Sequence, residues 1–221
     1  MKNANIAIYA YVRDNNKSKK IFAGAYDKIN FIIGDIKNTP KISGNIDYII
    51  HCASITASKT FIEKPAETID TAYTGTRSML EFAKLKNIRS FVYLSSLEVF
   101  RITNSQEVNE NDYGYIDILN PRSSYSESKR MCECLCVCYY KEYDVPVKIA
   151  RLVQVLGAGV DYNDTRVAVQ FARSVIENKG IVLKKAVFDI DVPTEYAPNL
   201  NRIRSLGWKA EIGLENDYRR M

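Results

Sequence analysis

The fold of this chain is decided by the stretch Pro121-Arg-Ser-Ser-Tyr-Ser-Glu-Ser-Lys-Arg-Met-Cys-Glu133. Tyr125 and Lys129 lie four residues apart in it, so on a helix their side chains share one face, one turn apart. A positive charge beside a phenol favours the phenolate, which can exchange a proton with an alcohol near neutral pH. The upstream segment Tyr93-Leu-Ser-Ser-Leu-Glu-Val-Phe100 adds the hydroxyl of Ser96. The pattern indicates a redox active site formed by Ser96, Tyr125 and Lys129.

Short apolar segments alternate with longer helical patterns along the chain. We expect strands over residues 5–12, 29–33, 46–52, 90–94 and 147–152. Helical periodicity covers residues 65–86, 121–143 and 164–178, and Pro65 suits the first turn of its helix. On the last helix, the side expected to be buried carries Val167, Phe171, Val175 and Ile176. This alternation predicts an α/β fold in which helices flank a parallel sheet.

Length and composition predict one domain of a cytoplasmic protein. The chain has 221 residues, and no apolar run approaches the ~20 residues that a membrane-spanning helix needs. The start of the sequence has no signal-peptide pattern, so we expect neither export nor a membrane partner. The net charge of +5 is scattered along the chain, without a basic face interleaved with aromatic residues. A nucleic-acid partner is therefore not expected.

Four of the five cysteines alternate within one predicted helix, at Cys132, Cys134, Cys136 and Cys138. Residues two apart on a helix point about 200° apart, so these four thiols cannot converge on one metal ion. A pair at i and i+4 would form half a site, but the sequence offers only His51 and Cys52 to complete it. We expect small buried residues in a reducing compartment and no metal site.

The active-site stretch carries a resemblance to a known family. Pro121, Tyr125, Ser128, Lys129 and Glu133 fit the pattern P-x-x-x-Y-x-x-S-K-x-x-x-E of the extended short-chain dehydrogenase/reductases, the NAD-dependent epimerases and dehydratases of nucleotide sugars. Ser96 matches the catalytic Ser/Thr of that family. The resemblance implies a Rossmann-like sheet, NAD as cofactor and a nucleotide-sugar substrate. The alternative is an ordinary amphipathic helix, in which Tyr125 is a half-buried core edge and Lys129 a solvated charge.

The resemblance also implies residues that bind the cofactor. Gly34-Asp35-Ile36 resembles the family's G-D-[LI] turn, where the aspartate approaches the adenine, and a plain turn is the alternative. The segment from His51 to Ser54 resembles H-x-A-[AS], which places His51 and Ala53 along the phosphate and ribose; there His51 is expected as structural lining rather than as a proton shuttle. Arg13 follows the first predicted strand and would favour NADP over NAD, or is a surface arginine.

Substrate-contacting residues follow from further matches. Arg151-Leu-Val-Gln-Val-Leu-Gly-Ala-Gly159 resembles R-x-x-N-V-Y-G-P-G, with Gln154 in place of the asparagine that contacts the nucleotide-sugar phosphate. Glu98 stands where the dehydratases have the second residue of an Asp-Glu pair, whereas Leu97 replaces the first. That departure favours an epimerase over a 4,6-dehydratase. In the helix match N-x-x-G-T, Ala72 replaces the asparagine before Gly75 and Thr76.

Two parts of the family pattern are missing from these 221 residues. The sequence begins at what should be the second strand, and its ten glycines include no G-x-x-G-x-x-G turn for the cofactor pyrophosphate. In the strand order 3-2-1-4-5-6 the missing first strand is central, so the second and fourth strands either pair directly or leave their edges open. Residues 180–221 resemble only a remnant of the substrate lobe followed by the C-terminal tail.

Two functional hypotheses follow. In the first, Tyr125 exchanges the proton of a sugar 4-hydroxyl, Ser96 hydrogen-bonds that oxygen, and Lys129 holds the nicotinamide ribose and keeps the tyrosine pKa low. In the second, the chain is a truncated, non-catalytic remnant with weak or no cofactor binding. Relatives pair through two helices, so we expect a homodimer through residues 65–86 and 121–143.

Overall fold

The computed structural model of the protein describes residues 6–103, 107–153, 155, 157, 160–164, 166–180 and 197–209. Its contacts divide the chain into two compact units. The first consists of Met1–Arg101 and Tyr113–Leu152, and the second of Ile102–Asp112 and Val153–Met221. The main core and the predicted catalytic residues belong to the first unit.

A three-stranded parallel sheet forms the centre of the first unit. Its strands, in spatial order, are β3 (Tyr48–His51), β4 (Ser90–Ser96) and β6 (Val147–Leu152). The register pairs His51 with Tyr93 and Ser96 with Leu152. Because the strands are parallel, their carboxyl ends lie at one edge of the sheet, where α/β folds bind ligands. The predicted α/β fold with a parallel sheet is confirmed.

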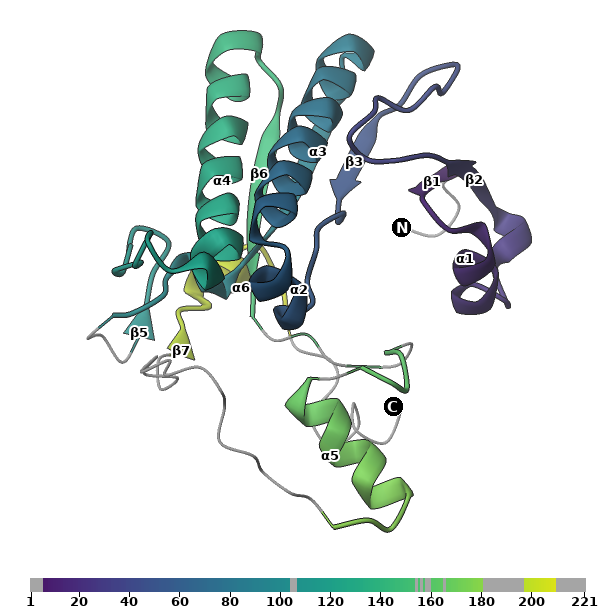
Figure 1. Cartoon of the computed structure of the whole chain (residues 1–221). Helices are drawn as coiled ribbons and strands as arrows, with labels where there is room; N and C mark the ends of the chain where they lie inside the picture. The colour runs from purple at the N-terminus through teal and green to yellow at the C-terminus, as the bar shows by residue number, and fades with distance from the viewer. Residues whose placement is uncertain are drawn as a thin grey trace. The chain divides into compact units, whose positions relative to one another are not determined.

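Two long helices, α3 (Pro65–Lys86) and α4 (Ser124–Tyr143), run side by side against this sheet (Figure 1). They form the crossovers from β3 to β4 and from β4 to β6, and right-handed crossovers place both helices on one face. Pro65 opens α3, and Asn87 ends it in a left-handed conformation (φ 47°). Asp144 ends α4 in the same way (φ 55°). The predicted helix 65–86 is confirmed, and 121–143 divides into a short 3₁₀ turn, η3 (Pro121–Ser123), and α4.

The core lies between the sheet and the two helices. Leu80 and Phe91 are completely buried, and Tyr93 is nearly so. Burying one such side chain stabilises the fold by roughly 1.5–3 kcal/mol. The buried cluster is made of Ile49, Ala72, Met79, Leu80, Phe82, Ala83, Ile88, Phe91, Tyr93, Cys132, Cys136, Tyr139 and Val145. The core therefore joins β3 and β4 to α3 and α4.

The first two strands form a separate sheet. β1 (Ile8–Val12) pairs in parallel with β2 (Ile29–Ile33), and α1 (Asn15–Ile21) and η1 (Tyr26–Lys28) connect them. Among the described residues no strand pairs with the outer edge of β3, and Tyr48 and Ile50 of this strand are 64% and 66% exposed. The sequence allowed two arrangements, in which the flanking strands either pair directly or leave their edges open. Within the part of the chain that it describes, the structure shows open edges.

The second unit contains the remaining described elements. They are β5 (Glu107–Val108), α5 (Val167–Ile176), β7 (Ala197–Pro198) and α6 (Asn201–Ser205), and β5 pairs with β7 in parallel. The expected buried side of α5 is wrong at its end, because Val175 and Ile176 are 75% and 68% exposed. Packing instead buries Val169, which with Ala172 lines a hollow beside Tyr162. The apolar residues of α5 thus extend beyond the face that its unit covers.

The cysteines only partly follow the prediction. Cys132 and Cys136 are buried in the core, whereas Cys134, Cys138 and Cys52 are exposed. Helical geometry explains the difference, because residues four apart on α4 share a face whereas residues two apart point about 200° apart. No group of metal-ligating side chains occurs within the described ranges. In the same part of the chain, no helix has the length and apolarity to cross a membrane.

Candidate active site

Ser96 and Tyr125 meet where β4 ends and α4 begins. Ser96 is the last residue of β4 and precedes the 3₁₀ turn η2 (Leu97–Val99). Its Oγ accepts a hydrogen bond from the backbone N–H of Glu98 at 3.2 Å. Tyr125 is the second residue of α4, and the Ser96 side chain lies close enough to its phenol to lower the phenol's pKa. The structure therefore brings together the predicted serine and tyrosine, which lie far apart in the sequence.

The phenol of Tyr125 is partly shielded from water. Its ring stacks on Phe61 of α2 (Ser58–Glu63), with ring centroids 4.4 Å apart and planes 14° apart. Burial raises the pKa of Tyr125 above its ordinary value. The Ser96 side chain and the charge of Arg122 oppose this rise, whereas the charge of Glu98 adds to it. Without cofactor, the site therefore favours the neutral phenol.

Lys129 lies one turn after Tyr125 on the same helix, as predicted, and it is 5% exposed. Its Nζ donates to the carbonyl of Leu94 at 2.8 Å and lies 5.7 Å from the ring centroid of Tyr125. Burial lowers the pKa of this ammonium. Its depth rules out the alternative of a solvated charge on an ordinary amphipathic helix. Ser96 and Arg122, rather than Lys129, are the groups that oppose the rise of the Tyr125 pKa. The Lys129 ammonium is directed to a backbone carbonyl instead.

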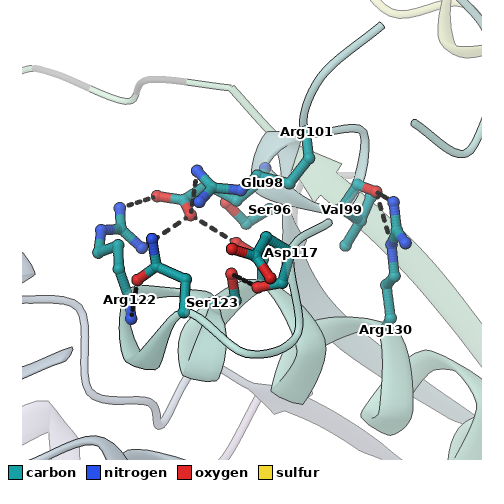
Figure 2. Close-up of polar contacts among 10 residues, drawn as sticks. Ser96, Glu98, Val99, Arg101, Asp117, Arg122, Ser123 and Arg130 are labelled. Carbon is teal, nitrogen blue, oxygen red and sulfur yellow. Dashed lines mark hydrogen bonds and ion pairs between the residues drawn. The ribbon is translucent and has the colours of Figure 1, made fainter. Parts of the chain in front are cut away.

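Glu98 lies at the centre of a polar cluster beside Ser96 (Figure 2). Arg122 donates to both of its carboxylate oxygens, at 2.7 and 3.1 Å, and Ser126 Oγ donates to Oε2 at 2.8 Å. Arg101 Nη1 is 3.8 Å from the same Oε2. The side chains of Arg101 and Arg122 are only 12% and 11% exposed. Glu98, predicted to contact substrate, is thus bound by the protein itself.

Two of the residues predicted for the cofactor follow β3. His51 ends this strand and is buried, with Nε2 3.2 Å from Thr76 Oγ1 and its ring against Tyr93. Burial, and secondarily the charge of Lys129, lower the pKa of His51 to about 4. The neutral, enclosed imidazole agrees with a structural lining. Ala53, two residues further on, is exposed.

The other predicted cofactor residues lie near β1 and β2. Arg13 directly follows β1 and is exposed. Asp35 caps its own turn, with Oδ1 accepting from the Lys37 amide at 2.9 Å, while its carbonyl accepts from the hydroxyl of Tyr11. Ile36 packs against α3 so closely that a Cβ on Gly75 would lie 3.0 Å from its side chain. Gln154 lies outside the described residues.

Comparison with known proteins places this chain in a family. The sequence matches the NAD dependent epimerase/dehydratase family over residues 1–204. The chain belongs to this family. Over 138 residues it is 30% identical to UDP-glucuronic acid decarboxylase 1 of Danio rerio, a match that covers 62% of this chain and 33% of the relative. UDP-glucuronic acid decarboxylase 6 of Arabidopsis thaliana is 27% identical over 140 residues, covering 63% and 40%.

Solved structures show the same fold for this epimerase/dehydratase-family protein. UDP-glucuronic acid 4-epimerase from Bacillus cereus, in complex with UDP-glucuronic acid and NAD, superposes with a TM-score of 0.68 at 22% identity. The match covers 80% of this chain and 57% of that one. A dTDP-glucose 4,6-dehydratase from Streptomyces venezuelae, also with NAD bound, has a TM-score of 0.65 at 18% identity, covering 80% and 54%. The chain thus spans little more than half of these structures and a third to two fifths of the curated relatives.

Sequence reasoning missed several residues of this family member's site. Arg122 precedes Tyr125 by three residues and Ser126 follows Arg122 by four, so helical spacing could have placed the Arg122 and Ser126 side chains next to each other beside the tyrosine. Phe61 gave no such signal, because it lies on a short helix that the periodicity did not reveal. Arg101 is held at φ 45°, a conformation that a sequence does not announce for a non-glycine residue.

Proposed function

We propose that this chain carries the catalytic group of an NAD-dependent nucleotide-sugar epimerase or dehydratase, which oxidises a sugar 4-hydroxyl to a transient ketone. One observation supports this most strongly: Ser96, at the carboxyl end of a parallel strand, lies close enough to the phenol of Tyr125 to lower its pKa, with Lys129 one turn further along. A substrate hydroxyl bound beside Ser96 could exchange its proton with the Tyr125 phenol. The departure at Leu97 favours an epimerase over a 4,6-dehydratase.

Each residue has a distinct role in the proposed reaction. Tyr125 takes the proton of the 4-hydroxyl as the ketone forms, and Ser96 donates a hydrogen bond to the same oxygen. Bound NAD would supply the hydride acceptor and a positive charge that favours the phenolate. One of the three N–H donors of Lys129 bonds to the carbonyl of Leu94, so the other two can reach the hydroxyls of a ribose. The substrate class is a nucleotide sugar.

The fit of the described residues to a dinucleotide is uneven. Tyr125, Lys129 and the chain after His51 provide polar groups at strand ends, where a nicotinamide and its ribose would bind. Asp35 offers a carboxylate for the adenine end, and Arg13 makes NADP the alternative to NAD. The 221 residues contain no glycine-rich turn for the pyrophosphate. We therefore expect cofactor binding by this chain to be weak.

The second candidate function is a non-catalytic remnant that keeps the triad. The separation of β1–β2 from β3–β4–β6 supports it, because the pyrophosphate of a dinucleotide binds beside the strand that would join them. The two proposals differ in a measurable property, which is saturable binding of the cofactor.

Titration with NAD(H) and NADP(H), followed by calorimetry and cofactor fluorescence, is expected to show saturable binding in the submillimolar to millimolar range. With UDP-glucuronic acid or UDP-glucose added, Tyr125→Phe should lower turnover by about 10²-fold or more, because it removes the proton-transfer group. Tyr140→Phe, at an exposed position of the same helix, is the matched control and should leave turnover unchanged. Absence of saturable binding at millimolar cofactor would favour the remnant.

The outer faces of α3 and α4 support a homodimer as part of the proposed function. Ile69 and Tyr73 of α3 and Met131 of α4 are exposed and line a shallow apolar hollow together with Ala66 and Asp70. Sedimentation velocity is expected to show a dimer, and Ile69→Lys should convert it to a monomer by placing a charge in the interface. Leu85→Lys, on another face of α3, is the control that should remain dimeric. A monomeric wild-type chain would refute this expectation.

A further inference from the structure

The carboxylate of Glu98 has little capacity left for a substrate. Oε1 accepts from Arg122 at 2.7 Å, whereas Oε2 accepts from Arg122 and Ser126 at 3.1 and 2.8 Å and lies near Arg101. We call these four residues the Glu98 cluster. A general base needs a lone pair directed at the substrate, and three hydrogen bonds already occupy most of the acceptor positions of this carboxylate. The contacts therefore argue against proton transfer by Glu98.

The Glu98 cluster is instead placed to hold the residues on both sides of it in position. On one side, the backbone N–H of Glu98 donates to Ser96 Oγ, so the turn that carries the carboxylate also orients the serine. On the other side, Arg122 and Ser126 precede and follow Tyr125 at the start of α4. The cluster thus joins the end of β4 to the first turn of α4 on both sides of the tyrosine.

Neighbouring contacts reinforce the same junction. Arg130, two turns along from Arg122, donates through Nε and Nη2 to the carbonyl of Val99 at 2.9 and 2.7 Å (Figure 2). The guanidinium of Arg122 also lies 4.8 Å from the ring centroid of Phe61, on which Tyr125 stacks. A displacement of Arg122 would therefore change both the turn after β4 and the support of the phenol.

We propose that Glu98 is a positioning residue, which together with Arg122 and Ser126 holds the hydroxyl of Ser96 against the phenol of Tyr125 and leaves proton transfer to the tyrosine. The consequence for catalysis rests on the proposed function, whereas the positioning itself does not. The pair also balances charge at the phenol, because Glu98 and Arg122 act on the Tyr125 pKa in opposite directions. The other groups that face this phenol are Ser96, Phe61 and Lys129.

The decisive experiment measures the titration of Tyr125 in the full chain without cofactor, by NMR of ring-labelled tyrosine. The Tyr125 signal is assigned among the 15 tyrosines by comparison with Tyr125→Phe. Arg122→Gln should shift this pKa upward, because it leaves the charge of Glu98 unopposed, and Glu98→Gln should shift it downward. The double variant should return close to the wild type. Glu127→Gln, a charge removal elsewhere on α4, is the matched control and should leave the titration unchanged.

A purely structural role gives a different pattern. If the substitutions only loosened the site, both would expose Tyr125 to water and lower its pKa toward the ordinary value, since burial is what raises it. A downward shift in Arg122→Gln, or no shift in either variant, would overturn the proposal. Arg122→Lys keeps the charge without the two-pronged contact, and its shift should lie between those of wild type and Arg122→Gln.

Turnover provides a second readout where the chain is active. Glu98→Gln should lower kcat by less than the 10²–10⁴-fold that removal of a general acid or base costs, whereas Tyr125→Phe should reach that range. A loss of 10²-fold or more in Glu98→Gln without a shift in the Tyr125 titration would assign proton transfer to Glu98 and overturn the proposal. A chain without turnover would contradict the proposed function alone, because the titration in the absence of cofactor still decides the positioning role.

Discussion

The only imidazole of the protein is expected to titrate near pH 4, well below the 6.5 of a free histidine. His51 is 4% exposed, its Nε2 lies 3.2 Å from Thr76 Oγ1, and its ring contacts Phe91 and Tyr93. Removing a charged imidazolium from water into this environment is unfavourable, and the charge of Lys129 adds to the cost. Because there is one histidine, a proton–carbon NMR titration reports it without assignment. An imidazole that titrates at pH 6 or above would contradict this description.

The same shift makes stability depend on pH in a defined window. Between about pH 4 and 6.5 the unfolded chain binds a proton at His51 and the native chain does not, so stability falls as the pH falls through this range. The shift corresponds to roughly 3 kcal/mol when the pH is well below 4. Urea unfolding of wild type and His51→Gln at several pH values should show that the substitution removes this part of the slope. Carboxylates contribute equally to both proteins, so the difference between them isolates the histidine. Parallel pH profiles of the two proteins would refute the assignment.

Removal of Glu133 is expected to destabilise the fold strongly. Its carboxylate accepts from Arg151 Nε at 3.0 Å and from Nη2 at 2.7 Å, and the two side chains are 8% and 12% exposed. This pair ties α4 to β6. Deleting one partner of a buried pair leaves the other charge poorly solvated, which costs about 3–5 kcal/mol. Glu133→Ala should therefore lower the free energy of unfolding, measured in urea, by about 3 kcal/mol or more.

A double variant separates the contribution of the intact pair to stability from the penalty for leaving one charge unpaired. Glu133→Leu combined with Arg151→Met replaces both charges by apolar side chains, and such replacements are often neutral or stabilising. We expect the double variant to recover most of the loss seen in Glu133→Ala. The exposed pair Lys59 and Glu63 provides the comparison, because Glu63→Ala should change stability by less than ~1 kcal/mol. Equal effects at the buried and exposed pairs would contradict this argument.

Much of the first unit could be predicted because its signals are local. Pro65 and the apolar spacing that follows define α3 to the residue, and the Tyr125–Lys129 spacing places both side chains on one face of α4. Parallel strand order then brings Ser96 to the same edge of the sheet. Each of these inferences needs only a few neighbouring residues and one topological rule.

The rest depended on tertiary context. The stacking of Phe61 on Tyr125 joins two helices separated by more than fifty residues, and no periodicity signals such a contact. The burial of Lys129 could not be foreseen, because a lysine is usually solvated, and its partners, the carbonyl of Leu94 and the ring of Tyr93, lie far away in the sequence. The apolar residues of α5 predicted a wide buried face, but Val175 and Ile176 are exposed. Side-chain type alone does not show which face of a helix packs against its neighbours.

The open edge of β3 has a consequence for hydrogen exchange. In a strand, the N–H and C=O groups of alternate residues point to opposite sides, so only every second amide of Tyr48–His51 can bond to β4. The alternate amides have no ladder partner among the described residues. Ile49 is 7% exposed and belongs to the buried core cluster. Neighbouring amides of this one strand should consequently differ in protection by orders of magnitude, so that solvent reaches the backbone of the core without any unfolding of its side chains.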